Sequence, residues 1–119
     1  MQNKYTSLKL SKFLRNKGFK KGSDWWWSHK WEGSSDKDAG QDILTWGTDE
    51  YNTLPLCPAY DILNDLCVKY SDEIFGKKSY KTKKVLELVQ QGKKEEAEQY
   101  IIDNIYERNT KKIILQASI

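Results

Sequence analysis

The sequence has few of the residues that most often carry chemistry. Among its 119 residues there is one histidine, His29, and there are two cysteines, Cys57 and Cys67. One histidine and two cysteines ten positions apart exclude the usual zinc-binding spacings and a CxxC redox pair. P-loop, dinucleotide-binding glycine and nucleophile-elbow motifs are missing too. We therefore expect no metal, no cofactor, no catalytic residue and no enzymatic activity.

Long apolar runs are also missing. The first ten residues, MQNKYTSLKL, lack the apolar stretch of a signal peptide, and no segment approaches the length of a membrane span. Two cysteines in a chain without a secretion signal are expected to be free thiols in a reducing compartment. These features predict a cytoplasmic protein that does not act at a membrane.

What is present favours one folded domain over residues 1–119. Hydrophobic residues make up 38% of the chain and aromatic residues 13%, and large rings supply much buried area per residue. Residues 1–38 hold nine Lys or Arg and four Asp or Glu, whereas residues 39–78 hold three and seven. A basic front and an acidic middle can steer partners of opposite charge, although solvated faces explain the same pattern.

The first half of the chain predicts a helix followed by a small sheet. A helix over residues 7–17 has an apolar stripe, and Gly18 suits the left-handed position that ends it. Residues 24–28 and 43–46 have the aromatic and β-branched composition of strands, with a short extended piece at 30–32. The polar residues 33–41 predict a mobile loop.

The second half predicts helices. Residues 49–58 are expected to be a connector, because Pro55 and Pro58 are unfavourable in a helix and in a central strand. Apolar spacing predicts one long helix over residues 61–76, with Asp61 as its N-cap. Residues 83–90 and 94–108 predict an αα-hairpin, and the pattern of the 109–119 tail fits either an edge strand or a helix extension. The expected class is therefore α+β.

The least ordinary feature is the concentration of tryptophan. All five lie between positions 25 and 46 of the chain. Side chains of neighbouring strand residues point to opposite faces, so Trp25 and Trp27 are expected on one face and Trp26 on the other. Unless both faces of the sheet are covered, at least one indole is exposed.

Three interpretations of this cluster remain open. Each ring taken singly is most simply explained as core. As a cluster, the rings favour a protein interface, in which tryptophan is enriched, including an interface between two copies of the chain in a dimer. The alternative is a stacking platform for single-stranded nucleic acid or a nucleotide, with nearby lysines on the phosphates. The candidate binding residues are Trp25, Trp26, Trp27, Trp31, Trp46, Lys20, Lys21 and Lys30.

Three further residues could carry chemistry, and each has a simpler explanation. His29 lies between Trp27 and Trp31, where a lone histidine is usually structural or exposed. Cys67 falls on the apolar stripe of the predicted long helix and is expected in the core. Cys57 could be an exposed thiol, but no basic neighbour in the sequence activates it.

Two segments resemble a known group of proteins. The helix end SKFLRNKGF at residues 11–19, the aromatic strand and the segment PAYDILNDL at residues 58–66 are similar to small uncharacterised proteins encoded by phages and prophages. The resemblance covers about residues 7–76, and it implies an accessory protein that acts inside a bacterial host. It implies no catalytic residue. Together with the tryptophans, it predicts a non-catalytic protein that binds a host or phage protein through an aromatic surface.

Overall fold

The computed structural model describes residues 4–33, 35, 37–49, 51–77 and 79–106. These residues form helices and one three-stranded antiparallel sheet, so the chain belongs to the α+β class. They divide into two compact units, residues 1–65 and 66–119. The expected single-domain organisation stays a prediction.

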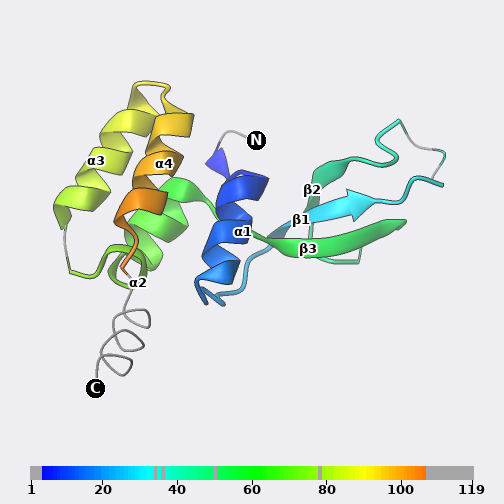
Figure 1. Ribbon diagram of the computed structural model, residues 1–119, viewed down its shortest axis with the longest axis horizontal. Coiled ribbons are helices and arrows are strands. Elements are labelled where there is room, and N and C mark those ends of the chain that lie inside the picture. The colour runs from blue at the N-terminus through cyan, green and yellow to red at the C-terminus, as the bar shows by residue number, and fades with distance from the viewer. Residues whose placement is uncertain (1–3, 34, 36, 50, 78, 107–119) are drawn as a thin grey trace, which may run out of the picture. The chain divides into compact units, whose positions relative to one another are not determined.

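Helix α1, Leu8–Asn16, confirms the predicted first helix (Figure 1). The Ser7 hydroxyl accepts a hydrogen bond from the Leu10 amide and caps its N-terminus. At the other end Gly18 has a φ of 86°, and the Phe19 amide donates to the Leu14 carbonyl. This is the left-handed termination that the glycine predicted.

The sheet has the strand order β2-β1-β3 (Figure 1). The central strand β1, Trp25–Lys30, is longer than predicted and includes only the first residue of the extended piece expected at 30–32. Strand β2, Asp42–Trp46, pairs with one side of β1 and agrees with the predicted strand over residues 43–46. The described residues between them, in the expected mobile loop, form turns.

Strand β3, Thr53–Ala59, shows that the predicted connector was wrong. Pro55 and Pro58 pair with Ser28 and Trp26 of β1. The backbone groups of Asp24 and Lys30 bond toward the β2 side, and hydrogen-bonded pairs alternate along an antiparallel ladder, so Trp26 and Ser28 also face β2. Neither proline therefore occupies a position that needs an N–H toward β1. Proline is tolerated at such outward positions of an edge strand.

A β-bulge interrupts the pairing of β1 with β3. Trp27 pairs with Cys57 and Ser28 with Pro55, which leaves Leu56 as the extra residue. The Arg15 guanidinium of α1 donates a hydrogen bond to the Leu56 carbonyl. This hydrogen bond joins helix α1 to strand β3, against which the helix packs.

The predicted long helix over residues 61–76 is replaced by two shorter elements. A π-helix, η2, spans Ile62–Lys69, and a short α-helix, α2, spans Ser71–Phe75. The predicted N-cap is confirmed, because the Asp61 carboxylate accepts hydrogen bonds from the Leu63 and Asn64 amides. Apolar spacing located the helical region but could not distinguish π from α geometry, and the division between the two units falls inside η2.

The second unit contains the predicted αα-hairpin. Helix α3, Ser79–Gln90, begins four residues earlier than expected, and α4, Lys94–Asn104, packs against it. Gly92, with a φ of 75°, lies in the turn between them. Among the described residues of this unit, the buried hydrophobic side chains are Leu66, Cys67, Ile74, Phe75, Val85, Leu88, Ala97 and Ile101. The 109–119 tail lies outside the described residues.

Candidate binding surface

One face of the sheet gathers three of the residues on which the binding hypothesis rests. Trp25 and Trp27 alternate with Trp26 along β1, and they lie directly opposite Trp46 and Leu44 of β2. We call the side of the sheet that carries Trp25, Trp27, Leu44 and Trp46 the tryptophan face. Trp25 and Trp46 meet edge to face, with ring centroids 5.5 Å apart and an interplanar angle of 85°.

The N-terminal segment covers part of the tryptophan face. The Tyr5 ring lies 5.4 Å from Trp25, centroid to centroid, and the Trp27 indole N–H donates to the Thr6 carbonyl at 2.9 Å. Trp25 and Trp27 are consequently half-buried. Trp46 has no such cover, and 66% of its surface is exposed.

Several side chains on the opposite face of the sheet are deeply buried. Ser28 and Thr45 on this face are buried, and their hydroxyls are 3.0 Å apart. Trp26 also lies on this side and donates its indole N–H to the Ser23 carbonyl at 3.0 Å.

The tryptophan cluster is therefore divided. Trp25, Trp26 and Trp27 are half-buried, Trp46 is exposed at one end of β1, and Trp31 is 51% exposed just beyond the other end. The five residues do not form one continuous platform. The accessible aromatic surface on the tryptophan face is centred on Trp46.

The three candidate lysines are not brought together at this surface. Lys30 is only 7% exposed, which leaves it poorly placed to reach a phosphate. Lys21 is half-buried, and its carbonyl accepts a hydrogen bond from the Tyr60 hydroxyl. Lys20 is exposed, and it lies five residues before Trp25, the first residue of β1.

His29 is paired rather than isolated. Its Nδ1 lies 2.9 Å from the Asp42 carboxylate, which stands directly opposite it on β2. Both residues continue the tryptophan face, two positions beyond Trp27 and Leu44. Neither Asp42 nor Leu44 is among the binding residues predicted from the sequence. The alternation of Asp42, Leu44 and Trp46 could have placed them on one face, but the pairing register with β1 could not be read from the sequence.

Both cysteines are free thiols, and both are buried. Burial raises the pKa of the Cys57 thiol, while the positive charges of Arg15 and Lys12 lower it by less. A thiol held protonated is a weak nucleophile. The alternative of an exposed Cys57 thiol is thus wrong, because β3 turns this side chain toward the core.

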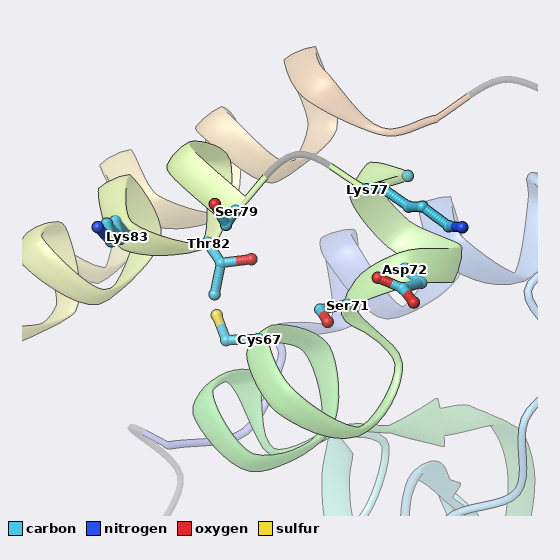
Figure 2. Close-up of a pocket in the computed structure, with 8 residues that line it drawn as sticks. Cys67, Ser71, Asp72, Lys77, Ser79, Thr82 and Lys83 are labelled. Carbon is cyan, nitrogen blue, oxygen red and sulfur yellow. The ribbon is translucent and has the colours of Figure 1, made fainter.

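The second unit contains a pocket of about 410 Å³ between the α2 region and α3 (Figure 2). Figure 2 shows the Cys67 sulfur beside Thr82, while the ends of Lys77 and Lys83 point away from one another. The remaining lining residues are Ser71, Asp72, Gly76 and Ser79. Because the two ammonium groups do not converge, the pocket lacks the paired charge of an anion site.

Neither a metal centre nor a membrane span emerges from the described residues. Among them, no three His, Cys, Asp or Glu side chains gather closely enough to hold a metal ion. No helix within the same part of the chain is both long and apolar enough to cross a bilayer.

No protein-family model, curated protein or solved structure matches this chain. The resemblance to phage-encoded proteins therefore stays a prediction.

Proposed function

We propose that this chain is a non-catalytic protein-binding protein whose contact surface is the tryptophan face around Trp46. The observation that carries the proposal is the exposure of Trp46 on a strand, beside an indole that is held in place. An exposed tryptophan on a rigid element gives a large contact area and loses little side-chain entropy on binding.

The charge around Trp46 favours a protein partner over a nucleic acid. Asp42 lies on the same strand and the same face as Trp46. Asp49 follows Trp46 by three residues, and Asp24 lies opposite Gly47 on the neighbouring strand side, and both are exposed. Carboxylates repel phosphates, and of the three candidate lysines only Lys20 is exposed. A partner that presents apolar and basic side chains suits this surface best.

Affinity capture with matched variants tests the proposal. The immobilised wild-type chain is compared with Trp46→Ala and with Tyr80→Ala, which removes an equally accessible ring (60% exposed) from α3 in the other unit. A specific partner should be retained by the wild type and by Tyr80→Ala and lost with Trp46→Ala. Retention of every captured protein by Trp46→Ala would contradict the proposal.

Tryptophan fluorescence separates the two classes of partner. Titration with single-stranded oligonucleotides and nucleotides should leave the emission unchanged at low salt. Quenching that disappears as salt is raised would instead support nucleic-acid stacking, because phosphate contacts weaken steeply with ionic strength. The Trp46→Ala variant would show whether the same ring is responsible.

A further inference from the structure

The outer edge of β2 presents a row of backbone groups in a definite order. The Gly47 amide donates to the Asp24 carbonyl, and the Lys30 amide donates to the Gln41 carbonyl. Hydrogen-bonded and non-hydrogen-bonded pairs alternate along an antiparallel ladder. Ile43 and Thr45 therefore direct their backbone groups toward β1. Asp42, Leu44 and Trp46 direct theirs to the outside.

The two edges of the sheet differ in how they are protected. On β3 the outward positions at 55 and 58 are prolines without an N–H, and a bulge breaks the regular spacing. Such features block the addition of another strand. Strand β2 has no proline, and it pairs only with β1 in the described sheet. It is the edge that can accept another strand.

We propose that β2 pairs antiparallel with β2 of a second copy of the chain, about a two-fold axis at Leu44. Leu44 then lies opposite Leu44 of the other copy, and Asp42 lies opposite Trp46. All three outward residues of each strand enter hydrogen-bonded pairs, so the edge donors and acceptors of both copies are satisfied. This pairing rests on the proposed function in using β2, but its backbone hydrogen bonds come from the strand edge and not from the indole rings.

The side chains that meet across the axis favour pairing with a second copy of β2 in the register centred on Leu44. On the tryptophan face the axis brings the carboxylate of Asp42 next to Trp46 of the other copy. The indole N–H of Trp46 has no acceptor within the described part of the chain, and a carboxylate is a strong one. On the opposite face Ile43 meets Thr45, a β-branched pair favourable across strands. A register centred on Asp42 would instead oppose two carboxylates.

The product is a continuous sheet of six strands in the order β3-β1-β2-β2-β1-β3. Its outermost strands are the proline-bearing β3 of each copy, so pairing stops at the dimer. The two tryptophan faces become neighbours, because a two-fold axis normal to the sheet keeps them on one side. Self-pairing thus doubles the aromatic surface that the proposed function uses.

The test is sedimentation equilibrium of the full chain, with two variants of one residue. Leu44→Pro removes the outward N–H without touching the bonds to β1, and Leu44→Ala shortens the same side chain but keeps the N–H. The average mass of the wild type and of Leu44→Ala should rise with concentration toward twice the monomer mass. Leu44→Pro should stay monomeric with an unchanged circular-dichroism spectrum. A wild type that is monomeric throughout, or a Leu44→Pro variant that associates like Leu44→Ala, overturns the pairing.

A cross-link keeps the proposal testable even where the proline variant does not fold. In the proposed register Leu44→Cys places two thiols at a directly opposed pair, within the range of Cα separations that a disulfide spans. Mild oxidation should yield a disulfide-linked dimer. Ile43→Cys, which faces Thr45 and not its own counterpart, should yield far less. Equal cross-linking of the two variants overturns the register, and the buried native cysteines leave the readout clear.

The two proposals fail in different ways. If the wild type is monomeric and the Trp46→Ala variant no longer captures the partner, the pairing is rejected and the proposed function is kept. A dimer abolished by Leu44→Pro, combined with capture that ignores Trp46→Ala, keeps the pairing and rejects the function.

Discussion

Trp25 and Trp46 lie opposite one another on neighbouring strands, and their indole rings meet edge to face. The rings have unequal surroundings, since Trp25 also contacts Tyr5 whereas Trp46 faces solvent. The pair joins a fixed ring to an accessible one. Its accessible member can serve in binding without holding the core together.

We expect Trp46→Ala to cost little stability. The edge-to-face contact is worth about 0.5–1.5 kcal/mol beyond area burial, and Trp46 buries little of its surface. The free energy of unfolding in urea should fall by about that amount. Trp25→Ala should cost more, because it also removes the contact with Tyr5. An equal or larger loss for Trp46→Ala would show that this ring is structural, and it would weaken its assignment as a contact residue.

A buried hydroxyl network ties the N-terminal segment to the end of β3. The Thr6 Oγ1 lies 2.6 Å from the Ser11 Oγ and accepts a hydrogen bond from the Tyr60 amide at 3.0 Å. Thr6→Val keeps the shape but leaves that amide without its acceptor. An unsatisfied buried donor costs about 1–3 kcal/mol, which urea denaturation can measure. Thr48→Val, at an exposed position, is the control and should change stability by less than about 0.5 kcal/mol.

Much of this architecture could be predicted from local signals. Gly18 after an apolar stripe located the end of α1, and Asp61 located the start of the π-helix. Both could be predicted because helix capping depends on residues adjacent in the sequence to the helix end. Strand β3 was not predicted because its two prolines argued against a strand. A proline is tolerated in an edge strand where the position of its missing N–H faces away from the neighbouring strand. That depends on a register set by β1, which is distant in sequence.

The candidate binding surface could likewise be predicted only in part. Alternation along β1 separates the faces of Trp25 and Trp26 by geometry alone. The burial of Lys30 and the exposure of Trp46 depend on which chain segments cross or cover each face, and local sequence does not encode that. The pairing of His29 with Asp42 likewise needed the β1–β2 register.

The Asp61 carboxylate is expected to contribute through capping rather than through its charge. It accepts hydrogen bonds from two amides at the start of η2. The Lys4 Nζ lies 3.6 Å from the Asp61 Oδ2, but the Lys4 side chain is half-exposed to solvent. Asp61→Ala should cost about 0.5–2 kcal/mol. Asp61→Asn, which keeps the side-chain oxygen, should recover most of the loss in thermal unfolding. An equal loss for both variants would point instead to the ion pair, as would a strong dependence on salt.

The two thiols should react only when the chain opens. Cys57 and Cys67 are both buried, and only an accessible thiolate can attack the sulfur of a disulfide reagent. At neutral pH the native chain should react slowly, and both thiols should react at once in denaturant. Fast labelling of one thiol in the native chain would show that its element opens locally, and Cys57→Ala and Cys67→Ala would identify which one.

The raised pKa of Cys57 also predicts a pH dependence of stability. Burial keeps this thiol protonated in the folded chain, so in alkaline solution the unfolded chain loses its proton first. Between the unfolded and the folded pKa the folded chain binds more protons, and the free energy of unfolding therefore falls as pH rises. The decline should begin near the ordinary thiol pKa of about 8.5 and be smaller in Cys57→Ala. Urea denaturation from neutral to alkaline pH measures it, and parallel curves for the two proteins would assign the decline to other groups, such as Tyr100, whose pKa burial also raises.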